Sequence, residues 1–239
     1  MKNTMLLTVG SLLAASAIHV SAAVIVQDDF SGDSATDLNG TAADVGGTWT
    51  ADTVYPWKAD GSYDSTAFND KSAFIALSGS LETGTIYTLT ATVGSHTDSF
   101  FYLGLHDAAP STSSRLQAQD NGIQMEWDAI GDTAANLHIN AGTSESRPLT
   151  GAYNNTLSMV INTGSDLTTA NVDFYSGASL VGSVTYDVTD LNHLVMGWEG
   201  GNGAVDIDSV TFSSQAVPEP SSTALIGLAG IGFILRRRR

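Results

Sequence analysis

Apolar residues occupy every second position in several short stretches of the chain. The spacing is clearest in residues 87–93 and recurs in residues 101–105, 157–161 and 172–174. These stretches are rich in β-branched and aromatic residues, and such alternation predicts strands with one buried face. No window of a dozen residues between the two terminal segments keeps the apolar spacing of an amphipathic helix. The body of the chain is therefore predicted to be all-β.

The strands predicted in residues 24–215 number about a dozen, and each has one apolar face. Such strands bury their apolar faces by forming two antiparallel sheets packed face to face. Residues 156–186 are expected to form a three-stranded meander, with a turn at Ser176-Gly177. The predicted fold class is an antiparallel two-sheet β-sandwich in a single domain.

A change of phase is visible in the last predicted strand. Val205 and Ile207 alternate in one phase, whereas Val210 and Phe212 alternate in the other. A β-bulge at Asp208 would account for this change, because a bulge inserts one extra residue into a strand.

Several of these stretches resemble the strands of concanavalin-like and laminin-G-like jelly rolls. They are the opening residues 28–30, the hairpin-like segment 171–183, and the closing segments 193–198 and 203–212. The resemblance implies that the sandwich has the concanavalin-like jelly-roll arrangement.

Residues 1–23 have the features of a secretory signal peptide. Lys2 precedes an apolar stretch over residues 5–18, and Ser21-Ala22-Ala23 offers small residues for cleavage after Ala23 or Ala22. A retained membrane helix is the alternative, but the apolar stretch is shorter than the ~20 residues that span a bilayer. Export by the Sec machinery is therefore expected.

Residues 216–239 have a different composition from the body. Pro218, Glu219 and Pro220 precede an apolar run over residues 223–235, and the run is followed by Arg236, Arg237, Arg238 and Arg239. As a helix at ~1.5 Å per residue the run is roughly 20 Å long, which is short of a ~30 Å hydrocarbon core. Four arginines would stay on the cytoplasmic side. We expect a short transmembrane helix here, and membrane association through this tail alone.

The order, spacing and position of these tail features resemble the PEP-CTERM sorting signal. That signal is found in Gram-negative bacteria that make extracellular polymeric material. The resemblance implies that a membrane exosortase recognises Pro218, Glu219 and Pro220. It also implies cleavage near this motif and release or attachment at the cell surface or in the extracellular matrix. An ordinary C-terminal anchor is the alternative.

Charge and cysteine content exclude several classes of function. The chain has 25 acidic and 9 basic residues and a net charge of −16. Residues 24–217 hold 24 of the acidic and four of the basic residues, a net charge of −20. This excess argues against nucleic acid as a partner, because phosphate binding needs Lys and Arg. The absence of cysteine excludes disulfides, thiol catalysis and cysteine zinc sites. The histidines show no metal-ligand spacing and are expected to be solvated or half-buried.

Four aspartates form a predicted calcium site. Asp28 and Asp29 lie near the first strand, and Asp206 and Asp208 near the last. The resemblance to jelly-roll modules implies a structural Ca²⁺ that joins these two strands, and carboxylate oxygens are the ligands this ion prefers. Solvated aspartates at strand ends are the alternative.

Glu126 and Asp128 form a carboxylate pair on one predicted strand, and both face the same side because they are two residues apart. The stretch is similar to that of laminarinase-type hydrolases, which implies Glu126 as nucleophile and Asp128 as its helper. The second glutamate of that family is missing, because Ala129, Ile130 and Gly131 occupy its window. We therefore do not expect an enzyme, and a glycan-active hydrolase is the alternative.

Aromatic residues supply a predicted sugar-binding platform. Tyr55 and Trp57 flank Pro56 in a predicted loop, and Trp198 lies near the end of the body. Exposed aromatic faces stack on sugar rings, but packing in the core is the commoner fate of tryptophan. The sequence thus favours an exported, non-enzymatic β-sandwich that is a structural or carbohydrate-binding component of extracellular polysaccharide.

Overall fold

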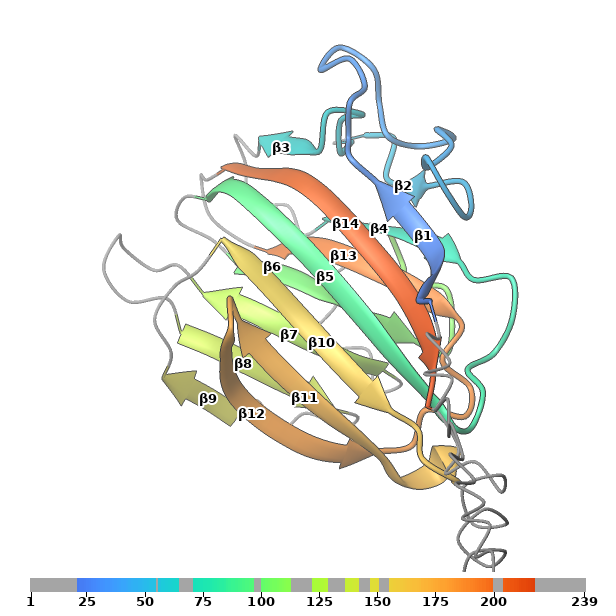
Figure 1. The fold of residues 1–239 in the computed structure, drawn as a ribbon. Coiled ribbons are helices and arrows are strands. Elements are labelled where there is room, and N and C mark those ends of the chain that lie inside the picture. Colours follow the sequence, from blue (N-terminus) through green and yellow to red (C-terminus); the bar gives the residue numbers. More distant parts are fainter. Residues whose placement is uncertain are drawn as a thin grey trace, which may run out of the picture. The chain divides into compact units, whose positions relative to one another are not determined.

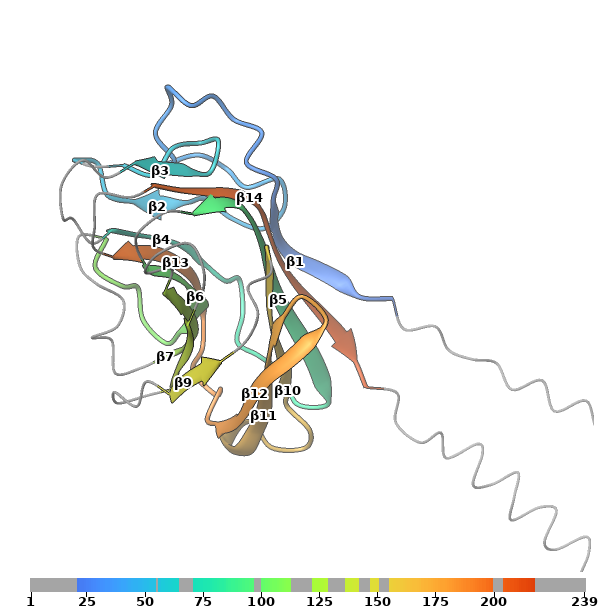
Figure 2. The same cartoon turned by 90° about the vertical axis from the view of Figure 1, so that its left-hand side faces the viewer.

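Two antiparallel β-sheets form the part of the chain that the computed structural model describes. This part comprises residues 21–54, 56–64, 71–96, 100–112, 122–128, 136–141, 147–150, 155–199 and 204–217. The first sheet, here called the β14 sheet, has the strand order β1-β14-β5-β10-β11-β12, with β3 also paired to β14. The second, the β6 sheet, has the order β2-β4-β13-β6-β7-β8-β9. Figure 1 shows the β14 sheet in front of the β6 sheet, and Figure 2 shows the same sheets as two layers.

The strands of the β14 sheet are β1 (Ala23–Asp28), β3 (Ser62–Asp64), β5 (Thr85–His96), β10 (Thr156–Asn162), β11 (Ala170–Ser176), β12 (Ser179–Tyr186) and β14 (Ala204–Ala216). Those of the β6 sheet are β2 (Thr50–Ala51), β4 (Lys71–Ala76), β6 (Phe100–His106), β7 (Gly122–Asp128), β8 (Asn136–Ala141), β9 (Arg147–Thr150) and β13 (His193–Glu199). A short 3-10 helix, η2 (Leu167–Thr169), lies between β10 and β11. The predicted two-sheet antiparallel sandwich is confirmed.

The core lies between the two sheets and consists of the alternating apolar residues that the sequence pattern identified. In the β14 sheet, the buried residues of β5 and β10 include Leu89, Val93 and Met159. Leu103 and Leu105 of β6 are buried from the opposite side. Removing such side chains from water is the main contribution to the stability of a fold of this kind.

Two local predictions within the β14 sheet are also confirmed. Strands β10, β11 and β12 form the expected antiparallel meander, and Gly177 takes a positive φ of 59° at its second turn. In β14 the register with β5 shifts between Asp206 and Ile207 and again between Ile207 and Ser209. Because of the shift around Asp208, Val205 and Ile207 as well as Val210 and Phe212 point into the core.

The predicted signal peptide and the predicted tail helix at residues 223–235 lie outside the described residues. Within the described part, no helix is long and apolar enough to cross a membrane. Residues Ala22–Val217 group together as one compact unit, which contains both sheets.

Candidate functional site

Three aspartates converge where the chain leaves β1. Gln27 and Val45 exchange two backbone hydrogen bonds, of 2.9 and 3.0 Å, and this bridge brings Asp44 beside Asp28 and Asp29. The carboxylates of the three aspartates offer oxygens that all lie within 4.8 Å of one another. The sequence pattern pointed to Asp28 and Asp29 but not to Asp44. The residues around Asp44 in the sequence do not indicate that its loop folds back to the edge of the sheet.

Asp28 is the buried member of this group and holds the loop in place. Its Oδ2 accepts a hydrogen bond of 2.6 Å from the indole Nε1 of Trp49, and its Oδ1 accepts one of 2.8 Å from the backbone N–H of Phe30. Burial raises the pKa of Asp28, and the neighbouring charge of Asp44 acts in the same direction. The Trp49 hydrogen bond works against this rise because it stabilises the charged form.

The other two predicted calcium ligands lie elsewhere on β14. Asp28 pairs with Val210, whereas Asp206 pairs with Ser62 and Ser95, roughly 13 Å further along the strand at ~3.3 Å per residue. Burial, and then the charges of Asp208 and Asp60, raise the pKa of Asp206. The structure thus divides the four predicted ligands between two places, and the calcium ion itself stays a prediction.

The group of Asp28, Asp29 and Asp44 fits the oxygen preference of a divalent cation. Three carboxylates in one place supply the hard oxygen ligands that such an ion prefers. Only part of their hydrogen-bonding capacity is used within the protein. Asp44 Oδ2 accepts a bond of 3.0 Å from Asp29 N–H, and Asp29 Oδ1 accepts one of 3.1 Å from Ser31 N–H.

Calcium should raise the melting temperature of the wild-type protein if it binds this cluster, because an ion that binds the native state alone stabilises it. We expect Asp44→Asn to remove the rise, and Asp206→Asn, which changes a carboxylate outside the cluster, to keep it. Differential scanning calorimetry in millimolar Ca²⁺ and in EDTA measures both shifts. Equal midpoints for the wild type in the two buffers would contradict the calcium prediction.

The predicted aromatic platform is corrected by the structure. Trp57 and Trp198 are 0% and 1% exposed, and Tyr63 packs between them with ring-centroid distances of 5.2 and 5.8 Å. Both tryptophans belong to the core, so neither offers an open face to a sugar ring. Both indole rings have a large apolar area, so burying them in the core is more favourable than exposing them to solvent. Tyr55 lies outside the described residues.

Glu126 lies on the outer face of the β6 sheet, which points away from the core. It pairs in register with Tyr102 on β6 and with His138 on β8, while Asp128 pairs with Phe100 and Asn136. Glu126 is 1% exposed. The side chain of Asp128 lies outside the described residues, so the distance between the two carboxylates is not defined.

A segment that follows β6 covers part of this outer face. The Oγ of Ser72 on β4 donates a hydrogen bond of 2.8 Å to the Ser111 carbonyl, and Ser72 N–H donates one of 3.2 Å to Thr112. Since β13 lies between β6 and β4, residues 107–112 must pass over it to reach Ser72. Beneath this crossing Tyr102 and Val195 form a second, small apolar cluster.

A buried polar group lies at one end of the same face. His106 pairs with His193 across the strands and is 2% exposed, which corrects the expectation of solvated or half-buried histidines. The Nε2–H of His106 donates a hydrogen bond of 3.0 Å to Gln124 Oε1. Burial lowers the pKa of His106 and of His193. The alternation of β6 places His106 on the same side as Tyr102 and Gly104, away from the core, so the sequence pattern did not indicate its burial.

The lowered pKa of His106 predicts a pH-dependent stability. In the unfolded chain its pKa is near 6.5, whereas in the folded protein it is lower. As the pH falls through 6.5, the unfolded state therefore binds a proton before the folded state does, and unfolding becomes more favourable. The free energy of unfolding should therefore be constant above about pH 7.5 and decrease towards pH 5 by up to about 1.4 kcal/mol per pH unit for this group.

Replacing His106 with Gln should flatten that decrease, because the titrating group is gone. Urea unfolding at several pH values measures the free energy for both proteins. The difference between them isolates the imidazole from the carboxyl groups of Asp28 and Asp206, whose raised pKa values act with the opposite sign. Equal pH slopes for wild type and variant would show that His106 does not cause the decrease in stability.

Solved structures similar to this chain include lectins and glucanases. An endo-1,3-β-glucanase from Streptomyces sioyaensis is 12% identical with a TM-score of 0.47, over 81% of this chain and 96% of that one. Winged bean acidic lectin complexed with methyl-α-D-galactose is 11% identical with a TM-score of 0.43, over 82% and 99%. Bacillus licheniformis β-glucanase is 11% identical with a TM-score of 0.44, over 78% and 96%. These likenesses concern the fold alone. No curated protein matches the sequence.

The family description "PEP-CTERM protein-sorting motif" matches residues 216–239. The match begins at Ala216, the last residue of β14, and includes Pro218, Glu219 and Pro220 as well as the four terminal arginines. The motif implies export and membrane-associated sorting, with processing by an exosortase. The chain thus carries a PEP-CTERM protein-sorting motif directly after the last strand of its β-sandwich.

Proposed function

We propose that this protein is an exported, non-enzymatic component of the cell surface or extracellular matrix, where its sandwich binds or supports polysaccharide. The observation that carries the proposal is the direct junction between sandwich and sorting motif. Val217 alone separates β14 from Pro218, and its N–H donates a backbone hydrogen bond of 2.8 Å to Gly84. The sandwich is therefore the cargo that the motif sorts.

The surroundings of Glu126 support a non-enzymatic role. A retaining glycosidase needs two carboxyl groups roughly 5–5.5 Å apart that substrate can reach. Glu126 is buried, and the chain has Ala129, Ile130 and Gly131 where the resembling hydrolases carry their second glutamate. The alternative of a glycan-active hydrolase would require this face to open.

The distribution of charge favours an uncharged partner. The body carries 24 acidic and four basic residues. Two of its bases form ion pairs within the sandwich, since Lys58 Nζ lies 2.6 Å from Asp37 and Lys71 Nζ lies 3.0 Å from Asp52. Such a surface repels anionic polymers at low ionic strength. Neutral glycans do not experience this electrostatic repulsion.

Changing Pro218, Glu219 and Pro220 to alanine should block processing in the native host. We expect an unprocessed precursor in the membrane fraction, because the sorting enzyme no longer recognises its substrate. Changing the adjacent Ser221 and Ser222 to alanine is the control and should leave processing intact. Immunoblots of membrane and released fractions distinguish the two, and normal release of the triple variant would refute the sorting role.

A glycan array tests the binding role. We expect the full chain, purified in detergent, to bind one class of neutral glycan without shortening it, and Glu126→Gln to bind equally well because that side chain is buried. Mass spectrometry of the incubated glycans reports any cleavage. Hydrolysis by the wild type that Glu126→Gln abolishes would establish the enzymatic alternative instead.

A further inference from the structure

The end of β14 is tied to the neighbouring loops as far as the last residue before the sorting motif. Ala216 pairs with Thr85 of β5, and Val217 N–H donates its hydrogen bond to the carbonyl of Gly84. Gly84 N–H in turn donates a backbone hydrogen bond to the carbonyl of Gly164. Gly84 and Gly164 take positive φ angles of 67° and 53°, which residues with a side chain rarely adopt. The backbone is therefore anchored up to and including Val217.

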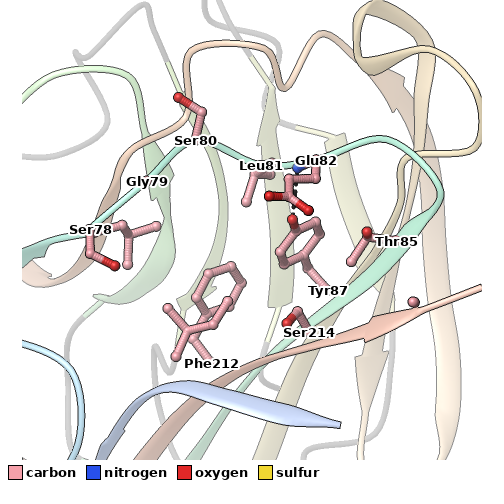
Figure 3. A pocket seen from close by; sticks show the side chains of 12 residues that line it. Ser78, Gly79, Ser80, Leu81, Glu82, Thr85, Tyr87, Phe212 and Ser214 are labelled. Carbon is pink, nitrogen blue, oxygen red and sulfur yellow. Dashed lines mark hydrogen bonds between the residues drawn. The ribbon is translucent and has the colours of Figure 1, made fainter. Parts of the chain in front are cut away.

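A buried hydroxyl group holds the loop that carries Gly84. Thr163 is 1% exposed, and its Oγ1 accepts a hydrogen bond of 3.0 Å from Thr85 N–H. The same hydroxyl donates a hydrogen bond of 2.8 Å to the carbonyl of Glu82. Figure 3 labels Glu82 and Thr85 on the connection between β4 and β5. The acceptor of the Val217 hydrogen bond thus lies in a loop that a buried hydrogen-bond network fixes.

A cut within β14 would separate core residues from the sandwich. The strand pairs with β1 on one side and with β5 on the other, and its Val210 and Phe212 are 1% and 0% exposed. Proteolytic enzymes act on segments that are exposed and free of pairing, so a paired strand is cut only after local unfolding. The peptide bonds of β14 are therefore protected in the folded protein, and the first bonds outside this protection follow Val217.

Five residues separate this anchored end from the apolar run of the tail. Residues 218–222 contain Pro218, Glu219 and Pro220 of the motif and two serines, and residues 223–235 are predicted to enter the membrane. We infer that the sorting enzyme cuts within this segment, so that the processed sandwich keeps all of β14 and ends at one of residues 218–222. The inference rests on the proposed sorting role and gives it a cleavage site.

The cut transfers the carbonyl carbon at the end of the sandwich from the tail to an acceptor. The peptide C–N bond breaks, and the nitrogen leaves as the new amino terminus of the tail with a proton from the acceptor. The carbonyl carbon bonds to the oxygen of water, or to the oxygen or nitrogen of a hydroxyl or amine group on a surface polymer. Water gives a released protein and the polymer gives an attached one, and both end at the same residue.

Mass spectrometry of the processed protein from the native host locates the cut. We expect the last residue of the sandwich to lie between positions 218 and 222, with the mass of a free carboxylate or of a bound acceptor. A last residue at Val217 or earlier, or within residues 223–235, would overturn the inference and leave the sorting role standing. Absence of any processing of the wild type would overturn the sorting role and the inference with it.

A pair of variants at Val217 tests the anchor in the full chain, purified in detergent. Val217→Pro removes the N–H that donates to Gly84, and Val217→Ala is the matched control that keeps it. The Val217 side chain is 39% exposed, so neither change affects the core. During limited digestion with proteinase K, we expect the wild type and Val217→Ala to lose the tail and keep β14. Val217→Pro should be cut between Ser214 and Ala216 about tenfold faster, because the end of the strand opens more often. Equal rates for the three proteins would overturn the anchor.

Discussion

The other features of this molecule depend on the pairing of β14 on both of its edges. Along its thirteen residues this strand hydrogen-bonds β1 and β3 on one side and β5 on the other. Its pairing with β1 sets Asp28 opposite Val210, and its side chains Phe212 and Ser214 line a pocket of ≈ 290 Å³ beside β5 (Figure 3). The shift of register around Asp208 keeps both halves of the strand in contact with the core. The shift also requires a glycine at position 94 of β5, because the Asp208 carboxylate occupies the space that a side chain there would need.

The outer face of the β6 sheet shows why buried polar residues are weak evidence of catalysis. Glu126 and His106 are titratable groups on one face of a sheet, and such groups invite an enzymatic interpretation. Both are nevertheless buried; burial lowers the pKa of His106, and its imidazole is hydrogen-bonded to Gln124. Ser72 also bonds to residues 111 and 112, and Tyr102 and Val195 of the same sheet are buried in a small apolar cluster.

The alternation of apolar residues was sufficient to predict the two-sheet sandwich, the meander of β10, β11 and β12, and the bulge in β14. The alternation and the bulge are visible within a few residues, and two packed sheets follow because each strand has one apolar face. The aromatic and acidic predictions failed in part because they depend on where loops return. Trp57 looked like a loop residue beside Pro56, but its indole is in the core against Tyr63. Asp44 carried no local signal, and only the backbone bridge from Gln27 to Val45 brings it to Asp28. Loop closure is a non-local property that no window of sequence contains.

The acidity of the body has a structural cause that is separate from any cation. In seven turns of the described part of the chain, an aspartate Oδ1 accepts a hydrogen bond from the backbone N–H two residues later; these are Asp28, Asp29, Asp33, Asp52, Asp60, Asp166 and Asp187. Such turns use aspartate to satisfy a backbone donor that no strand pairs. Bonds from Thr168 and Thr189 lower the pKa values of Asp166 and Asp187, which keeps these carboxylates charged. A sandwich with many loops therefore accumulates negative charge as a by-product of turn formation. The number of acidic residues therefore does not by itself indicate a metal site. The feature that points to one is the convergence of Asp28 and Asp29, at the end of β1, with Asp44 from the following loop.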